Sequence, residues 1–290
     1  MKRPLLPVLH LPLFLVGGLA WVVVLGVVTA LFFLADGIGT GVRPEELLTA
    51  SALGGLTIAQ SAGLAAWAGV LSLAVTDVPP WLSLQGAEIA RRARSAFALR
   101  RSSAVMVGTA LVGGLVVWTL PSWCADTLGH LFPERESTLA LVNKALNSPD
   151  LLGRVLMSLA VGVSAPVFEE LIFRGYVYRV LEIGFGTVAA LVGSTLLFAA
   201  FHLDPIHVVS LLPTAAFLGF LRWRSGSLWP PLLAHAVNNA LGVAGAQLFP
   251  DDPTSTLPLW VALVGFFAAI GVAVIGHRVA PEPASEPVRS

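Results

Sequence analysis

The sequence predicts an all-α protein: a polytopic transmembrane helix bundle of about eight spans, with its functional residues in the bundle core. Hydrophobic residues make up 56% of the 290 residues and charged residues only 12%, whereas soluble domains carry about 25% charged residues. The mean hydropathy is +0.82. At about 20 residues per span, the helices and their connections account for the whole length, so we expect no soluble domain.

Long apolar windows mark the expected spans. The first window follows Met1-Lys2-Arg3 and is too long for the apolar region of a signal peptide, so we expect it to be retained. A turn at Ile183–Gly186 separates the fourth and fifth windows. The eight windows are Leu11–Ala35, Leu53–Val75, Ala104–Leu120, Leu151–Phe173, Thr187–His202, Val208–Trp223, Leu228–Phe249 and Leu259–Gly276.

The chain divides into four segments, with no repeat of fixed period. Residues 1–150 hold three spans and their loops, 151–248 hold four spans that carry the polar motifs, 249–278 hold the last span, and 279–290 form a Pro- and Glu-rich disordered tail.

The single cysteine, Cys124, excludes an internal disulfide and a CxxC metal site. The formal net charge of zero and the lack of a basic arm argue against a nucleic-acid partner.

The basic residues of the connections predict the orientation of the bundle in the membrane. The connection after the second window carries arginines at 91, 92, 94, 100 and 101, so we expect it to be cytoplasmic, together with both termini. The acidic connections Asp36–Glu46 and Asp251-Asp252 then lie outside. We expect an integral, multi-pass protein of a bacterial plasma (inner) membrane.

Three short motifs place ionisable and amide side chains inside apolar windows, where each charged group costs about 2.5–3.5 kcal/mol to insert. The first is Glu169-Glu170-xxx-Arg174. In a helix Glu170 and Arg174 are four residues apart and share a face, so we expect them to pair. Glu169 lies about 100° further round the helix and is left free to face the bundle interior.

The second motif is Phe198-xxx-His202, in which the phenyl ring shares a helical face with the imidazole and can buttress it. Positions 169 and 202 lie about equally far from the turn at Ile183–Gly186, about 24 Å at 1.5 Å per residue. An antiparallel hairpin can therefore bring Glu169 and His202 side by side. A structural hydrogen bond is the competing role for a lone histidine in a membrane helix.

The third motif is His235-xxx-Asn239, again four residues apart on one helical face. The imidazole N–H and the carboxamide NH₂ are both donors, and two donors aimed at one point can stabilise an oxyanion. The competing role is hydrogen bonding between helices, which we expect for Asn238. For His207 we also expect a structural role.

These motifs together resemble the CAAX-protease and bacteriocin-processing (CPBP, or Abi) family of intramembrane proteases, which includes the Ras-converting CAAX endopeptidases. The family pattern is EExxxR, FxxxH and HxxxN in membrane helices, in the order found here. The phrases FRG at Phe173–Gly175 and RSGSLWPPLLAHAVNN at Arg224–Asn239 are also similar to the family. The resemblance covers Leu151–Leu248.

The resemblance implies hydrolysis of a peptide bond without a covalent acyl-enzyme. Glu169 would deprotonate a water held with His202, and His235 and Asn239 would stabilise the oxyanion. It implies no cofactor, although a His₂Glu zinc site of Glu169, His202 and His235 is the main alternative. The implied catalytic residues are Glu169, His202, His235 and Asn239, and the implied supporting residues are Glu170, Arg174 and Phe198.

The expected partners are the lipid bilayer and a membrane-anchored or lipidated peptide or protein substrate. Two other classes remain open: a proton-coupled transporter and a non-catalytic membrane scaffold or immunity factor. A transporter predicts two similar halves with broken helices, which the sequence lacks. Glu169 and His202 lie away from the cytoplasmic turn. Either the site therefore opens nearer the outer face than a CAAX protease with cytosolic substrates requires, or the span count before residue 151 is wrong by one.

Overall fold

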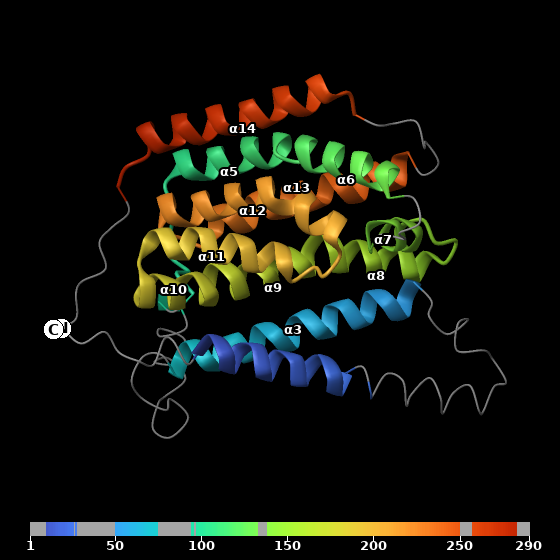
Figure 1. The fold of residues 1–290 in the computed structure, drawn as a ribbon, viewed down its shortest axis with the longest axis horizontal. Coiled ribbons are helices and arrows are strands. Elements are labelled where there is room, and N and C mark those ends of the chain that lie inside the picture. The colour runs from blue at the N-terminus through green and yellow to red at the C-terminus, as the bar shows by residue number, and fades with distance from the viewer. Residues whose placement is uncertain are drawn as a thin grey trace.

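In the computed structural model the chain is a bundle of helices whose axes run roughly parallel (Figure 1). The structure describes residues 10–25, 27, 50–74, 94–95, 97–132, 138–249 and 257–282. Every regular element within these ranges is a helix, so the predicted all-α class is confirmed.

The described helices follow one another along the chain in a simple order. His10–Leu25 comes first. The labelled elements that follow are α3 (Ala50–Ala74), α5 (Ala104–Val116), α6 (Thr119–Leu131), α7 (Thr138–Leu146), α8 (Leu151–Leu159), the π-helical η2 (Ala160–Ser164), α9 (Ala165–Glu170), the π-helical η3 (Leu171–Val177), α10 (Tyr178–Phe185), α11 (Thr187–Ala200), α12 (Pro205–Ser225), α13 (Trp229–Leu248) and α14 (Leu259–Val279).

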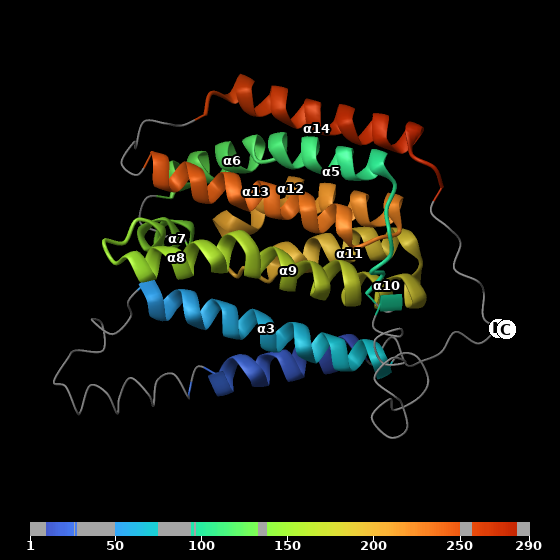
Figure 2. The same cartoon turned by 180° about the vertical axis from the view of Figure 1, so that it is seen from behind.

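The helices stack in successive layers, and both views show the same order. From top to bottom these are α14, then α5 with α6, then α12 with α13, then α8 to α11, then α3 with the N-terminal helix (Figures 1 and 2). The layer from α8 to α11 is therefore covered on both sides. This central layer carries the first two polar motifs, and α13 carries the third beside it.

Hydrogen bonds gather several helix ends at one end of the bundle, which we call the basic end. Arg100 Nε donates to Gly226 O in the α12–α13 turn at 2.5 Å, and Ser227 Oγ donates to Arg100 O at 2.6 Å. Arg224 Nη2 donates to His277 O in the last turn of α14 at 3.0 Å. The basic end carries Arg100, Arg101, Arg222, Arg224 and Arg278.

Five helical stretches among the described residues are long and apolar enough to cross a membrane, and the predicted count of eight spans is not confirmed. They are Ala52–Leu71, Ala104–Leu131, Leu151–Phe185, Pro205–Ser225 and Leu259–Val279. His10–Leu25 and Thr187–Ala200 are apolar but shorter. Helix α13 is not among the five, because it carries His235 and two asparagines.

Three predicted windows differ in extent. Part of Leu11–Ala35 lies outside the described residues, as do both acidic connections and residues 283–290 of the tail. The window that was expected to end at Leu120 continues as α6, because Pro121 falls in the first turn of that helix, where proline is tolerated. The fourth window continues through α10 to Phe185, where Gly186 with φ 90° makes the predicted turn into α11.

The elements from α8 to α10 form one continuous helix, Leu151–Phe185, which we call the central helix. Its hydrogen-bond pattern changes twice, on either side of the two glutamates. In η2 the backbone N–H of Ala165 bonds to Ala160 O, five residues back. The next donor in this register would come from Pro166, which has no N–H, so the carbonyl of Val161 loses its partner within the helix. A second π-helical segment, η3, follows directly after Glu170. Such bulges are common at functional sites.

Helix α13 packs against α5 through a glycine. A Cβ added at Gly114 would lie 2.7 Å from Ala234 O and 3.1 Å from Ala234 Cα, closer than side chains normally approach backbone. Small residues allow membrane helices to approach in this way. Because Ala234 precedes His235, this contact sets the position of the third motif.

Candidate active site

Glu170 and Arg174 form a buried ion pair at the junction of α9 and η3. Both side chains have 0% exposure, and Arg174 Nη1 donates to Glu170 Oε1 at 3.0 Å. Arg174 Nη2 donates to the carbonyl of Ala215 on α12 at 2.9 Å. The guanidinium also lies 4.3 Å from the ring centroid of Phe198 on α11. The pairing expected from the spacing is confirmed, and Arg174 links three helices.

His235 lies between the two glutamates. Its Nδ1 is 3.0 Å from Glu170 Oε1, and its Nε2 is 3.9 Å from Glu169 Oε2. The first distance is a hydrogen bond, which assigns the proton to Nδ1 because a carboxylate paired with Arg174 is an acceptor. The second is too long for a direct hydrogen bond, but one water can bridge it. His235 is buried, whereas the Glu169 side chain is 16% exposed.

Phe198 packs against both His235 and His202. Its buried ring lies 5.7 Å from the His235 ring and 5.3 Å from the His202 ring, edge-on to both. His202 Nδ1 lies 3.0 Å from Phe198 O, so that Nδ1 donates and Nε2 is left as an acceptor. Within the described residues no hydrogen bond or ion pair joins His202 to Glu169. The expected support of His202 by Phe198 is therefore present, and the expected pairing of Glu169 with His202 remains a prediction.

Asn239 fills the gap that Pro166 leaves in the backbone of η2. Its Nδ2 donates to Val161 O, the carbonyl without a helical partner, at 2.9 Å. Its Oδ1 accepts from Asn238 Nδ2 at 3.3 Å. One of the two amide hydrogens of Asn239 is thus used to join α13 to η2, and the second remains available. Sequence reasoning missed this role, although a proline inside a helix is the signal for it.

The three residues of the alternative zinc site do not assemble as a ligand set. No group of three His, Cys, Asp or Glu side chains within the described ranges is placed to hold a metal ion. His235 lies beside Glu169, and the ring of Phe198 packs against both imidazoles. A mechanism through zinc would need Glu169, His202 and His235 to converge on one point.

The chain turns sharply beyond His202. Leu203 has φ 59°, a strained conformation for leucine, and Asp204 then caps the N-terminus of α12. Burial raises the pKa of the Asp204 carboxyl, but hydrogen bonds from three backbone N–H groups outweigh this effect and hold the pKa below its ordinary value. These donors belong to Thr138, Ile206 and His207.

Two further residues support the site without appearing in the three motifs. Arg222 Nε on α12 donates to the carbonyl of Arg174 at 2.9 Å, which fixes η3 against α12. The His207 ring lies 4.5 Å from the His202 ring and packs against it. The contact of Arg222 could not be anticipated, because it joins two helices that are distant in the sequence.

The distance of the site from the basic end can be measured along α13 and along α12. His235 lies about 9 Å from Trp229, which begins α13 at the basic end, at 1.5 Å per residue. The carbonyl of Arg174 meets Arg222, which lies three residues before Ser225 at the end of α12, about 5 Å at 1.5 Å per residue. We call the group of Glu169, Glu170, Arg174 and His235 the Glu–Arg–His cluster. This cluster therefore lies in the half of the bundle nearer the basic end.

A buried cluster of charge inside a bundle of apolar helices characterises an integral membrane protein with a functional site at membrane depth. Residues 151–241 match the family model described as Type II CAAX prenyl endopeptidase Rce1-like, so the protein is an intramembrane protease. This part of the chain is therefore similar to the CAAX protease (CPBP) family. The match spans all seven predicted site residues. Comparisons with curated proteins and with solved structures gave no match.

Proposed function

We propose that this protein is an endopeptidase that hydrolyses a peptide bond of a membrane-associated or lipidated protein with a water activated by Glu169. The observation that carries this proposal is the position of His235 between the carboxylates of Glu169 and Glu170. An acid, a base and a structural cation in one buried cluster suit proton transfer. The proposal extends the peptidase activity of the family to a specific mechanism.

The two glutamates take different roles. Glu170 is committed to Arg174 and His235, both at 3.0 Å, so it holds the site together. Glu169 makes no direct hydrogen bond within the described residues and keeps 16% of its side chain exposed. Glu169 is therefore the carboxylate that can bind and deprotonate a water, as a general base must.

The reaction then proceeds in two proton transfers. The Glu169 carboxylate takes a proton from the water as its oxygen attacks the scissile carbonyl carbon. It returns that proton to the leaving amine nitrogen when the C–N bond breaks. The immediate products are a carboxylic acid and an amine, which exchange one further proton to become a carboxylate and an ammonium, and no bond to the enzyme forms. His202 Nε2, left as an acceptor by the bond of Nδ1 to Phe198 O, is a second contact for the water.

The oxyanion needs donors that are already in place. We assign this role to His235 and Asn239. A proton on Nε2, taken up before the substrate binds and kept through the cycle, makes His235 a donor on the side facing Glu169, while Nδ1 stays bonded to Glu170. The second amide hydrogen of Asn239 is the other donor, because the first is held by Val161 O.

The substrate class follows from the family and from the depth of the cluster. The family acts on prenylated, membrane-associated proteins. With the basic end cytoplasmic by the positive-inside rule, the cluster lies in the cytoplasmic half of the membrane, within reach of a substrate anchored in that leaflet. We therefore propose a membrane-anchored or lipidated substrate approached from the cytoplasmic side.

The test compares protein termini in membranes that carry wild type, Glu169→Ala or Glu282→Ala at matched expression. Glu282, three residues beyond the end of α14, is a carboxylate whose side chain is 88% exposed, and it serves as the control. We expect new peptide ends in the wild type and the control that are absent with Glu169→Ala. Identical profiles for all three, with the proteins folded and abundant, would favour a transporter or a scaffold instead.

A further inference from the structure

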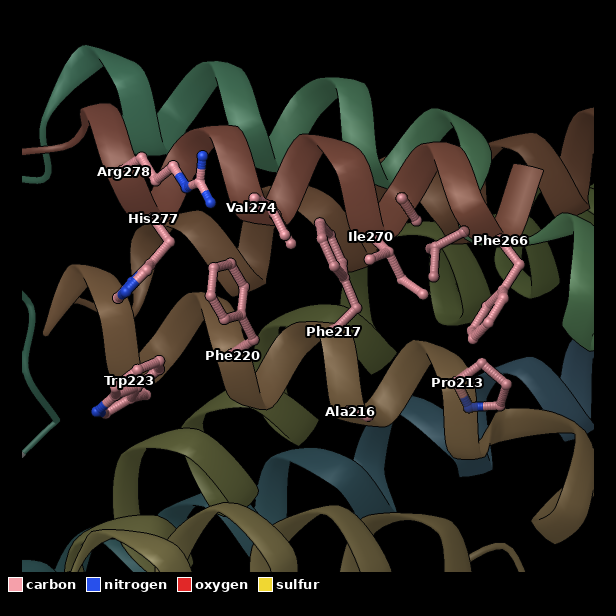
Figure 3. A pocket seen from close by; sticks show the side chains of 13 residues that line it. Pro213, Ala216, Phe217, Phe220, Trp223, Phe266, Ile270, Val274, His277 and Arg278 are labelled. Carbon is pink, nitrogen blue, oxygen red and sulfur yellow. The ribbon is translucent and has the colours of Figure 1, made fainter. Parts of the chain in front are cut away.

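The lipid-facing surface between α12 and α14 contains a groove that is separate from the Glu–Arg–His cluster (Figure 3). Its volume is about 580 Å³, within the range of about 300–1,000 Å³ typical of small-molecule pockets. Its walls are aliphatic and aromatic: Phe217, Phe220, Phe266, Ile270 and Val274. No acidic residue lines the groove.

The groove runs along α14. From Phe266 to His277 it follows α14 for about 16 Å at 1.5 Å per residue. This length equals about one leaflet of a hydrocarbon core about 30 Å thick. In length and in the apolar character of its walls the groove fits an extended alkyl chain.

One end of the groove is cationic and aromatic. The Trp223 ring stacks on the His277 ring, with centroids 5.6 Å apart and planes at 21° (Figure 3). Arg278 is exposed at the same end. Arg224 lies beneath, bonded to the carbonyls of His277 and Pro281, and is 3.6 Å from Glu282. A tryptophan with basic neighbours is typical of a membrane interface.

We propose that this groove binds one anionic phospholipid, with an acyl chain between α12 and α14 and the phosphate at His277 and Arg278. The apolar walls match the chain, and the positive charge at the mouth matches the headgroup. The positive-inside rule places this end at the cytoplasmic leaflet, which carries the anionic lipids. The assignment does not depend on the proposed peptidase mechanism, because the groove shares none of its residues.

The test is native mass spectrometry of the full chain in detergent with equal amounts of dioleoyl phosphatidylglycerol and dioleoyl phosphatidylcholine. We expect the wild type to retain the anionic lipid several-fold more than the zwitterionic one. Arg278→Gln should weaken retention of phosphatidylglycerol about fivefold, the effect of one basic residue near an anionic lipid. Arg154→Gln removes an exposed charge on α8, away from the groove, and should leave retention unchanged.

A second variant tests the alkyl chain site. Ala273 lines the groove, so Ala273→Phe should fill it and lower retention of both lipids. Ala268→Phe adds the same ring on an exposed part of α14 outside the groove and should not. Equal retention of the two lipids by the wild type, or equal losses in Arg278→Gln and Arg154→Gln, would overturn the proposal. Equal losses in Ala273→Phe and Ala268→Phe would also overturn it.

Discussion

The Nδ1 atom of His235 lies 3.0 Å from the same oxygen of Glu170, Oε1, that accepts a hydrogen bond from Arg174. A single carboxylate oxygen therefore joins α13 to the central helix and also neutralises the buried guanidinium. Oε2 of Glu170 has no partner within the described residues. Because Glu170 is occupied in this way, Glu169 is the glutamate left free for chemistry.

The buried ion pair makes a prediction about stability. Removing Arg174 leaves Glu170 buried without its cation, so Arg174→Met should lower the free energy of unfolding by about 3–5 kcal/mol. The double variant Glu170→Gln with Arg174→Met should be clearly more stable than Arg174→Met alone, because no unpaired charge remains. Denaturant unfolding in detergent measures both values. Equal stability of Arg174→Met and the wild type would contradict the pairing.

The contact of Gly114 with Ala234 predicts a loss of activity at a distance from the site. Gly114→Ala adds a methyl group 2.7 Å from Ala234 O, so α13 must move, and His235 with it. We expect at least a tenfold loss of cleavage rate, since misplacement by about 1 Å can cost about 100-fold. Gly108→Ala on the same helix meets nothing within 4 Å and is the control. If the two variants cleave substrate at the same rate, α5 does not position His235.

Asp204 predicts a pH dependence of stability. Its pKa in the folded protein is lowered, so its stabilising effect is present above the unfolded pKa of about 3.9 and is lost as the pH falls through the folded value. Asp204→Asn keeps a capping group but has no charge to titrate. Wild type should therefore be more stable than Asp204→Asn by about 1 kcal/mol at pH 7, and the difference should shrink below about pH 4. Thermal unfolding at several pH values tests this, and a constant difference from pH 7 to 3 would contradict it.

Metal removal separates the glutamate mechanism from the zinc alternative. Because Glu169 can act as the base without a metal, we expect purified protein to keep its cleavage rate after prolonged treatment with a strong chelator. A thermolysin-type zinc protease treated in parallel is the positive control for metal removal. Loss of cleavage that zinc restores, with the fold intact, would instead favour the His₂Glu site.

Local patterns predicted much of the fold and part of the site. The spacing of Glu170 and Arg174 was sufficient to predict their ion pair, and the turn at Gly186 was evident from its glycines. These features depend on residues near each other in the chain. The predicted window Ala104–Leu120 stops short of α6, in which Pro121 lies in the first turn, where proline is tolerated.

The contacts between distant segments could not be predicted in the same way. The bond of His235 to Glu170 depends on how closely α13 approaches the central helix, which Gly114 permits from the other side. The bond of Asn239 to Val161 O depends on a π-helical register that frees this carbonyl. Sequence spacing places residues on one face of a helix, but it does not specify which distant helix packs against that face.

The most direct test of the central claim is the hydrolysis of a prenylated CAAX-type peptide by purified wild type and Glu169→Gln in lipid nanodiscs. Glutamine keeps the shape of the side chain and removes the base, so the unfolding temperature should be little changed. We expect the cleavage rate to fall at least 100-fold. Cleavage by a well-folded Glu169→Gln protein at the wild-type rate would show that Glu169 is not the general base.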